Sequence, residues 1–586
     1  MRRILTAVLA AFGWLAAAAQ PALPVDSGTP ADTARYAFPV RGVAGLYAAN
    51  FGEIRPAHFH AGIDVKTDGV EGKELVAVGD GYVSRIVVTP SGYGRALYLT
   101  LSDGSTAVYG HLLRFRDDLE ACMQAERYRL SSNDVDLAFP AGRFPVSRGE
   151  RIGFSGNTGS SAGPHLHFEL REAGTDRRLN TVRTGLFRPK DDIPPLMLRL
   201  HYFQVDTVAG VCLRSAPVSC DLVREANGRY RLRRTEPLPV GRKGYFVMEV
   251  SDRRNGVNNT FGIWSLRGSV DGEPFFEYRM DGFDADQSRC SDAVSWYPRQ
   301  LRARAEVLQM ARLTGAPAAF YPVLREQGLI RTEPGETRNV RIEVEDDCGN
   351  CSVLTFAVCG TAAAFRAAAD STAQALRVGR SNSVGLGRVL SARIPAGALA
   401  EDTFCRPEQM DMPQPADTRI AVLSPAVRIF GTDIPLFREI TVSLQAEVPP
   451  ALKSRATLAS YNPATRRLSY VGGVCTGDAV QARTRTTGWL VAVVDTVRPT
   501  IRPQFADGAD CSRAETLRFT ASDNFSGIAS ATLSIDGRWV PCDRLPMRGL
   551  FYYRFETPPE RRTHTVTFAV TDALGNTARW EGSFYR

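Results

Sequence analysis

Five of the seven histidines in this chain lie between residues 58 and 167, in three short phrases. The phrases are His58-Phe-His60-Ala-Gly-Ile-Asp64, Tyr109-Gly-His111 and Gly163-Pro-His165-Leu-His167. Imidazole and carboxylate groups are the ligands of catalytic Zn²⁺ sites, which use three protein side chains and leave one position to water. The clustering therefore predicts a metal-dependent active site in the first third of the chain.

The spacing within two of the phrases suits strands. Gly62 and the preceding Arg55-Pro56 argue against a helix, and on a strand residues four apart share a face, so His60 and Asp64 can point at one ion. His165 and His167 are two apart and share a face for the same reason. Taken alone, the first phrase is equally compatible with an exposed histidine and a turn-capping aspartate.

Three further residues near these phrases have weaker signals. A lone histidine such as His111 is more often structural, and it gains weight only from the other two phrases. We expect His58 to lie at a substrate rim or behind a ligand, because a fourth protein ligand would displace the water. Glu169 continues the face of His165 and His167, where it could orient an imidazole or be an exposed strand carboxylate.

Short strands separated by glycine turns must position these side chains. Such a pattern predicts a compact antiparallel β domain over residues 36–195. One helical stretch, 117–128, interrupts it within a long segment, 114–150, that we expect to wall the groove of the site. The strands are expected at 75–78, 81–88, 96–101, 105–109, 152–155 and 166–171.

The remainder of the chain contains an internal repeat. Residues 246–252, which end in Ser-Asp, are echoed by 517–523, and each copy closes on an Asp-x-x-Gly-Asn turn, at 346–350 and at 572–576. Alternating strands joined by such turns predict immunoglobulin-like β-sandwiches. We expect one sandwich at 196–365 with an insertion near 295–328 that is helical at 302–313, a β-rich module at 366–495, and a last sandwich at 496–586. The predicted fold class is all-β and multidomain.

The N-terminus predicts export. Residues 1–19 have the pattern of a signal peptide, with Arg2-Arg3 before an apolar run and an Ala-rich cleavage site, and 20–35 read as a linker. We therefore expect an exported protein, periplasmic or extracellular and associated with the cell envelope, with no membrane anchor in its mature form. Export permits disulfides. Nearness in the sequence suggests the pair Cys212–Cys220, and membership of one domain suggests Cys405–Cys475 and Cys511–Cys542. The formal charge of +8 is dispersed, and no nucleic-acid motif accompanies it.

The combined motifs resemble one family. His60-x-Gly-x-Asp64, Tyr109-x-His111 and Gly159-x-x-x-Gly-Pro-His165-x-His167 are similar to the LytM/lysostaphin-type zinc metalloendopeptidases, also called metallopeptidase family 23 or the duplicated hybrid motif fold. The resemblance covers about residues 40–190. It implies an antiparallel β core with a groove, His60, Asp64 and His167 as ligands of Zn²⁺, and His111 and His165 as catalytic histidines that are not ligands.

The resemblance also implies a function, the hydrolysis of peptide cross-links in peptidoglycan by a zinc-activated water. His165 is then expected to take the proton of the water, and His111 to stabilise the oxyanion or protonate the leaving amine, although sequence alone does not fix which histidine does which. The partners would be peptidoglycan stem peptides and, through the C-terminal modules, the cell wall or another protein. The alternative is a non-catalytic wall binder or amidase activator, for which loss of ligands would be the sign.

Overall fold

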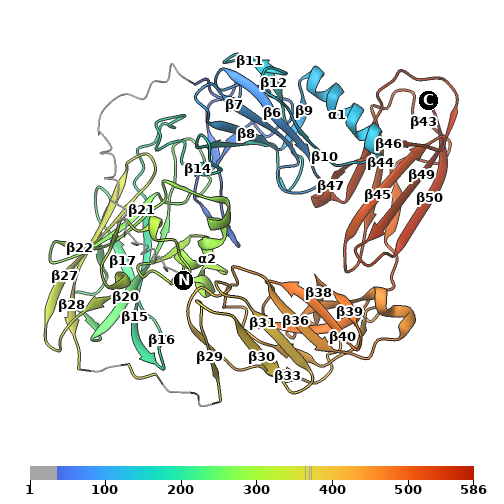
Figure 1. The fold of residues 1–586 in the computed structure, drawn as a ribbon. Coiled ribbons are helices and arrows are strands. Elements are labelled where there is room, and N and C mark those ends of the chain that lie inside the picture. The colour runs from blue at the N-terminus through green and yellow to red at the C-terminus, as the bar shows by residue number, and fades with distance from the viewer. Residues whose placement is uncertain (1–35, 363–364, 368–369, 371) are drawn as a thin grey trace, which may run out of the picture.

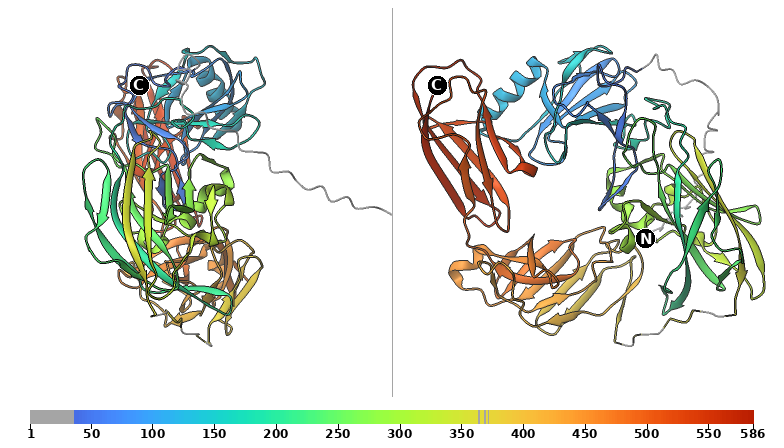
Figure 2. Two further views of the ribbon diagram at one scale, coloured as in Figure 1. Left: turned by 90° about the vertical axis from the view of Figure 1, so that its left-hand side faces the viewer. Right: turned by 180° about the vertical axis from the view of Figure 1, so that it is seen from behind.

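The computed structural model describes residues 36–362, 365–367, 370 and 372–586. The predicted signal peptide and linker, 1–19 and 20–35, lie outside the described residues. β-Strands in several sheets make up most of the regular secondary structure of the described chain, which confirms the predicted all-β, multidomain fold class. Four parts follow one another around a ring, and the last returns to the first (Figures 1 and 2). Within the described residues, no helix is long and apolar enough to cross a membrane.

Two antiparallel sheets build the first part. The larger has the order β1-β4-β13-β8-β7-β6-β10, with β11 and β14 at its margins, and these strands are β1 Tyr47–Ala49, β4 Ile63–Lys66, β6 Gly81–Val88, β7 Arg95–Leu101, β8 Thr106–Gly110, β10 Val135–Ala138, β11 Pro145–Val146, β13 His165–Arg171 and β14 Arg178–Leu179. The smaller sheet and a hairpin contain β5 Glu74–Val76, β9 Leu112–Phe115, β12 Arg151–Ser155, β2 Ile54–Arg55 and β3 His58–Phe59. The helix predicted at 117–128 is α1, Asp117–Leu130. The predicted strands agree with these to within about two residues.

The second part is built on one large sheet with the order β24-β20-β15-β17-β18-β28-β27-β21-β22-β25, to which β16, β19 and β26 are added. The strands are β15 Leu196–Val208, β16 Val211–Arg214, β17 Val218–Arg224, β18 Arg229–Leu232, β19 Leu238–Val240, β20 Lys243–Ser251, β21 Ser265–Val270, β22 Glu273–Arg279, β24 Glu306–Gln309, β25 Val323–Leu324, β26 Ile330–Arg331, β27 Thr337–Glu345 and β28 Cys351–Gly360. Short helices, η1 Ala285–Cys290, α2 Ser291–Val294, α3 Tyr297–Gln300, η2 Ala318–Phe320 and η3 Glu326–Gly328, occupy the inserted segment.

The third and fourth parts are smaller sandwiches. The third has sheets β30-β31-β36-β40-β39 and β33-β35-β41-β37-β38, with β34 beside β41 and a separate β29-β32 pair; its elements are β29 Gln374–Leu376, β30 Asn382–Leu386, β31 Leu390–Ile394, β32 Thr403–Cys405, β33 Glu408–Met410, β34 Ala421–Val422, β35 Ala426–Arg428, β36 Ile440–Gln445, η4 Pro450–Arg455, β37 Ala456–Asn462, β38 Arg467–Gly472, β39 Val474–Thr476, β40 Ala479–Thr484 and β41 Trp489–Val494. The fourth has sheets β42-β44-β48-β47 and β43-β50-β49-β45-β46; its elements are β42 Thr500–Pro503, β43 Ala509–Asp510, β44 Thr516–Ser522, β45 Ile528–Ile535, β46 Arg538–Val540, β47 Asp543–Leu545, η5 Pro546–Arg548, β48 Leu550–Arg554, β49 Thr563–Asp572 and β50 Thr577–Tyr585.

The first two parts share their packing. Phe51 and Phe59 belong to the hydrophobic core of the second part, where both contact Phe283 at ring-centroid distances of 5.3 and 5.5 Å. In return, Phe261 lies in the core of the first part. Strand β14 also pairs with β23, Gly282–Phe283, and extends the first sheet into the second part. The boundary expected at residue 195 is therefore a boundary in the sequence but not in the packing.

Two expectations, one about secondary structure and one about disulfides, are wrong. The helix predicted at 302–313 is replaced by strand β24, whose four residues are all buried because it pairs with β20 in the middle of the insertion. All eleven cysteines have free thiols, so none of the three expected disulfides is present. For one pair the register gives the reason, because Cys212 lies opposite Thr207 and Cys220 opposite Leu200 on the same strand β15. Seven residues of strand span about 23 Å, well beyond the reach of a disulfide.

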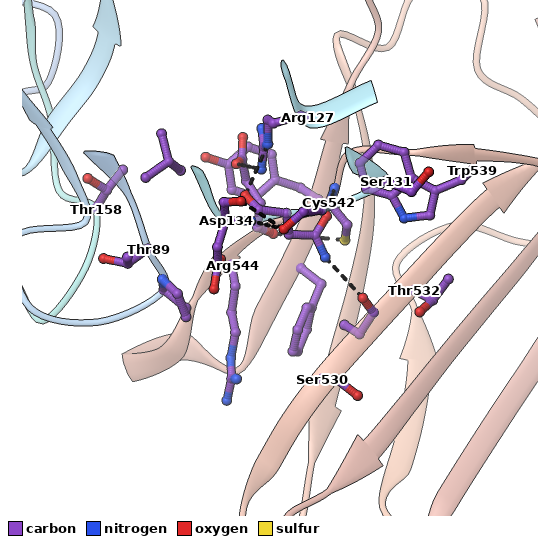
Figure 3. Close-up of a pocket in the computed structure, with 18 of the residues that line it drawn as sticks. Thr89, Arg127, Ser131, Asp134, Thr158, Ser530, Thr532, Trp539, Cys542 and Arg544 are labelled. Carbon is purple, nitrogen blue, oxygen red and sulfur yellow. Dashed lines mark hydrogen bonds and ion pairs between the residues drawn. The ribbon is translucent and has the colours of Figure 1, made fainter. Parts of the chain in front are cut away.

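Helix α1 closes the ring by contacting the fourth part. Asp543 accepts hydrogen bonds from Arg127, at 2.7 Å, and from Arg95, at 3.1 Å. Tyr128 packs edge-on against Trp539 with centroids 5.8 Å apart. A cavity of about 310 Å³ remains beside this contact, with Arg127, Thr158 and Cys542 in its wall (Figure 3). The segment 114–150 was expected to wall the groove of the site, and this expectation is wrong, because α1 faces the fourth part and no residue of 114–150 lines the cleft.

Candidate metal-dependent active site

Strands β4 and β13 bring the two separated phrases together. They are antiparallel neighbours, and Asp64 lies directly opposite His167 in the register. The close approach needs Gly62, because a Cβ at this position would lie 2.1 Å from the carbonyl oxygen of Phe168. The backbone between His60 and β4 therefore packs tightly against β13. This packing brings His60 and Asp64 close to His167.

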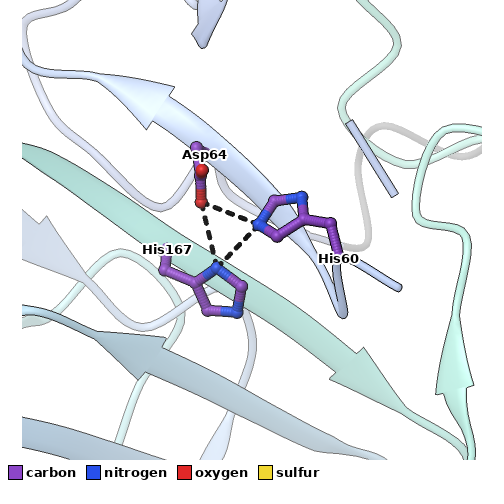
Figure 4. Close-up of side chains that lie close together, drawn as sticks. All are labelled: His60, Asp64 and His167. Carbon is purple, nitrogen blue, oxygen red and sulfur yellow. Dashed lines mark hydrogen bonds and ion pairs between the residues drawn. The ribbon is translucent and has the colours of Figure 1, made fainter. Parts of the chain in front are cut away.

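The three residues expected as metal ligands meet at one point (Figure 4). Asp64 Oδ1 lies 3.0 Å from His60 Nε2 and 3.0 Å from His167 Nδ1, and the two ring nitrogens are 3.1 Å apart. All three side chains are buried. Two imidazole nitrogens and one carboxylate oxygen within this distance form a donor set that fits a divalent metal ion.

Hydrogen bonds fix which nitrogen of each ligand is free. His60 Nδ1 lies 2.7 Å from the carbonyl oxygen of Asn50, which can only accept, so this nitrogen carries the proton and Nε2 offers its lone pair to the centre. Burial lowers the pKa of His60 to about 4, although the charge of Asp64 opposes the shift. His60 is therefore neutral near pH 7, as a metal ligand must be.

His167 is held between two carboxylates. Its Nδ1 faces Asp64, and its Nε2 lies 3.0 Å from Oε1 of Glu169, which is completely buried. Burial alone would lower the pKa of His167, but the hydrogen bonds and charges of Asp64 and Glu169 outweigh it and raise the pKa to about 9. Without a metal the ring holds a proton on Nδ1, and an ion would take the place of that proton. Glu169 thus orients an imidazole and is not an exposed strand carboxylate.

The other two histidines lie beside this cluster. The ring centroid of His111 is 4.8 Å from that of His165 and 6.0 Å from that of His167. His165 Nε2 lies 3.5 Å from Asp64 Oδ1. His111 has a φ of 64°, a left-handed conformation that is uncommon outside glycine and is often found where a site needs a side chain aimed exactly one way. Neither ring belongs to the ligand cluster.

Both of these rings turn the same nitrogen toward the cleft. His111 Nδ1 donates to the carbonyl of Thr158 at 2.8 Å, and His165 Nδ1 donates to that of Gly163 at 2.8 Å. Each Nε2 is therefore a proton acceptor in the neutral ring. Burial lowers the pKa of His111 to about 3, so this ring is neutral near pH 7. The oxyanion contact expected of His111 requires its imidazolium form, which burial disfavours.

A cleft of about 970 Å³ opens above the cluster. His58, whose ring donates to the carbonyl of Pro56 at 2.9 Å, is exposed and lines the rim, and it is outside the ligand cluster. Residues that sequence reasoning did not single out also line the cleft, among them Lys66, Tyr93, Arg178 and, from the second part of the chain, Phe283, Ala285 and Ser288. The second part thus contributes directly to the wall of the site.

Two of the missed residues contact the cluster itself. Arg55 donates to Oδ2 of Asp64 at 3.3 Å and to Glu53 at 3.0 Å, so it holds the ligand carboxylate from the outside. Tyr93 stacks on His167 with ring centroids 5.3 Å apart and donates to Glu169. Neither residue lies in a phrase with metal-ligand spacing. Only the fold brings Tyr93, on the loop before β7, to His167.

Comparisons with known proteins find relatives that are named as peptidases. An uncharacterized metalloprotease of Haemophilus influenzae is 32% identical over 135 residues, which is 23% of this chain and 22% of that protein. The DD-carboxypeptidase/endopeptidase Mpg of Neisseria meningitidis is 30% identical over 131 residues, 22% of this chain and 24% of that protein. The peptidoglycan DD-endopeptidase ShyA of Vibrio cholerae is 54% identical over 41 residues, 7% of this chain and 9% of that protein. This chain thus spans less than a quarter of each relative's length, and no family model matches it.

Proposed function

We propose that this chain, whose N-terminal part is a metallopeptidase domain of the LytM/lysostaphin type, is a zinc endopeptidase that hydrolyses peptide cross-links of peptidoglycan. The observation that carries the proposal is the convergence of His60, Asp64 and His167 on one point at the floor of an open cleft, with two further imidazoles beside it. The relatives named as endopeptidases support the substrate class.

Zinc suits the donor set. Two imidazoles and one carboxylate form the ligand set of catalytic zinc sites, in which a fourth position stays open. When bound, Zn²⁺ would act as a Lewis acid on the scissile carbonyl and lower the pKa of water toward about 7. His60, Asp64 and His167 would hold the ion, and Asn50, Arg55 and Glu169 would keep these three side chains in place through the contacts described above.

The chain's own residues then handle the protons. His165 lies beside the cluster with Nε2 free to accept, so we assign it the role of general base toward the attacking water. His111 also presents an accepting Nε2, and its lowered pKa makes its imidazolium, once formed, a strong acid that can give a proton to the leaving amine. The loop at 160–164 and Tyr93 border the cleft on this side.

The test is a digest of defined cross-linked muropeptides by the full-length, zinc-loaded protein, followed by mass spectrometry. We expect cleavage of the cross-link peptide, its loss on treatment with EDTA and recovery on addition of Zn²⁺. His165→Ala should keep its zinc and lose cleavage, whereas Asp411→Asn, an exposed aspartate of the third part, should behave like the unchanged protein. Intact cross-links and intact synthetic stem peptides after incubation with the zinc-loaded protein would refute the proposal.

The alternative, a wall binder or amidase activator without activity, is disfavoured by the filled ligand positions. It predicts that wall hydrolysis occurs only when a second hydrolase is added. We further propose that the protein acts outside the cytoplasm, in the periplasm or at the cell surface, because its first 19 residues have the pattern of a signal peptide. Fractionation of cells with an antibody to the protein tests this, and a purely cytoplasmic signal would contradict it.

A further inference from the structure

Three aspartates gather where the third part of the chain meets the fourth. Asp495 follows strand β41 in the connection between the two parts, Asp523 follows β44, and Asp572 ends β49. One carboxylate oxygen of each lies within 4.8 Å of those of the other two. Asp495 is completely buried, Asp572 is 2% exposed, and Asp523 is half-buried.

The hydrogen bonds of this cluster leave two oxygens unpaired. Both carboxylate oxygens of Asp572 have hydrogen-bond partners. They accept from the backbone N–H groups of Leu574 and Asn576, each at 2.8 Å, and from the Asn576 side chain at 2.7 Å. Asp495 Oδ1 accepts from Val497 at 2.8 Å, but its Oδ2 has no partner among the described residues. Asp523 Oδ1 is buried and equally without a partner in the described chain.

Unpaired carboxylate oxygens that are buried together are costly. Burial removes their hydration, and each charge repels the other two. Burial, with smaller contributions from Asp523 and Asp572, raises the pKa of Asp495 to about 6. Arg419, whose charge interacts with Asp495 and Asp523, is 60% exposed at its side chain and is already paired with Asp417 at 2.7 Å. The described residues therefore supply no buried positive charge to this cluster.

The first copy of the internal repeat has a similar arrangement of aspartates and asparagine, but it has a buried arginine nearby. There Asp346 accepts from Asn350 just as Asp572 accepts from Asn576, and the Asn350 side chain reaches the Asp191 carbonyl at 3.3 Å as that of Asn576 reaches the Asp495 carbonyl at 3.2 Å. Asp252 takes the place of Asp523.

In that first copy a buried guanidinium lies close to the carboxylates. Arg254 is 3% exposed and donates to Asp347 at 2.5 Å. Its charge also acts on Asp252 and Asp191, although neither oxygen of Asp252 has a hydrogen-bond partner among the described residues. In the second copy the residue two positions after the aspartate is Phe525, which packs against Tyr470 at a centroid distance of 5.8 Å. The two copies thus share a carboxylate frame, and only one of them contains its own cation.

We propose that Asp495, Asp523 and Asp572 bind one hard divalent cation of the Ca²⁺ class. The donors are all oxygens, and carboxylates with carbonyl oxygens and water are the ligand set of Ca²⁺. The ion would supply the buried positive charge that Arg254 supplies to the first copy. Because Asp495 belongs to the connection and the other two to the fourth part, it would fix the fourth part against the third and so support the contact of Asp543 with helix α1.

The experiment measures Ca²⁺ binding to the full-length, zinc-loaded protein by isothermal titration calorimetry after removal of free divalent ions. We expect one Ca²⁺ per chain for the unchanged protein and for the Asp411→Asn control, and a rise in melting temperature with Ca²⁺ in both. Asp523→Asn keeps the size of the side chain and removes one charge, so it should weaken binding about tenfold or more. The loss of charge should also remove most of the thermal shift.

Two outcomes would overturn the proposal: no Ca²⁺ heat with the unchanged protein, or the same affinity in Asp523→Asn as in the control. If Asp523→Asn does not fold, as judged by circular dichroism, Asp495→Asn replaces it with the same expectation. His167→Ala separates this site from the catalytic one, because it should lose zinc and keep its Ca²⁺. Binding of Mg²⁺ in place of Ca²⁺ would refute the choice of ion.

Discussion

The His60–Asp64–His167 cluster and the Asp495–Asp523–Asp572 cluster each bring three ligand atoms within 4.8 Å, and they differ in donors and surroundings. The first has two imidazole nitrogens, opens into a cleft of about 970 Å³ and has two more histidines beside it. The second has carboxylate oxygens alone and lies at the junction of two sandwiches. Nitrogen donors with an open side suit a reaction, whereas oxygen donors in a junction suit a structural ion.

The two clusters also differ in how their negative charge is balanced when no ion is bound. His167 holds a proton between Asp64 and Glu169, so the histidine cluster balances its own charge. The aspartate cluster has no such proton donor, and two of its oxygens have no partner in the described chain. A titratable ligand can therefore preform a metal site, whereas a cluster without such a ligand depends more strongly on the ion.

The largest effect should follow from removing a ligand of the histidine cluster. His167→Ala would take away one of the three proposed ligands, and a bound metal would supply several kcal/mol of transition-state stabilisation. We expect kcat/KM for muropeptide cleavage to fall about 10³-fold or more. The zinc content, measured by mass spectrometry, should fall with it.

The contrast with the aspartate cluster provides the control. Asp523→Asn should retain zinc and cleave small soluble peptides nearly as well as the unchanged protein. A comparable loss of zinc or of peptide cleavage in this variant would break the division between a catalytic and a structural cluster.

A smaller loss should follow from removing a histidine that is not a ligand. His165→Ala should lower kcat about 10²-fold, since general base catalysis contributes about 10²- to 10⁴-fold, while the zinc content stays unchanged. Loss of zinc together with activity would place His165 among the ligands instead.

Most of the candidate site residues could be predicted from the sequence because side chains alternate between the two faces of a strand with a regular period of two. The two-residue spacing of His165 and His167 predicts a shared face, and the motif order places Asp64 among the ligands; the structure brings these side chains together by pairing β4 with β13. Arg55 and Tyr93 carry no comparable signal, because their contacts with Asp64 and His167 depend on how loops cross the sheet. The cleft wall formed by Phe283 depends on packing between parts that are far apart in sequence.

The errors have a related cause. The run at 302–313 was expected to be a helix, but tertiary pairing with β20 makes strand β24, in which Val307 and Leu308 are both buried. A strand buried on both faces has no alternation that could distinguish it from a helix in the sequence. The predicted disulfide between Cys212 and Cys220 is absent because the two residues pair with distant positions of one long strand, β15. Nearness in the sequence therefore does not bring their sulfur atoms together.

A third effect should follow from breaking the contact between the first and fourth parts of the chain. Asp543 binds Arg95 and Arg127, and burial would raise its pKa but the two guanidiniums lower it to about 2. Asp543→Asn removes that charge from two buried arginines, of which Arg95 retains Glu120 at 2.7 Å. We expect a loss of about 2 kcal/mol in the stability of this contact, seen as a lower urea midpoint than for the exposed control Asp510→Asn.

This contact also reaches the active site. The backbone N–H of Arg95 donates to the Thr158 hydroxyl at 2.9 Å, and the Thr158 carbonyl accepts from His111. Asp543→Asn should therefore lower kcat by a few-fold with KM nearly unchanged, through His111. Equal urea midpoints and equal kcat in Asp543→Asn and its control would contradict this prediction. They would mean that other contacts hold the fourth part and that it does not influence the active site in the first part.

A last prediction distinguishes the two clusters by how their metal affinities depend on pH. The pKa of His167 is about 9 and that of Asp495 about 6, and both groups must lose a proton before an ion binds. As the pH rises from about 6.5 to about 7.5, zinc affinity should increase about tenfold, because His167 still holds its proton over this range. Over the same interval Ca²⁺ affinity should change less than about twofold, because Asp495 is already mostly ionised. Competition with chelating dyes at the two pH values measures both constants. A Ca²⁺ affinity that rises as steeply as that of zinc would mean that the aspartate cluster, like the histidine cluster, is held by a proton that the ion must replace.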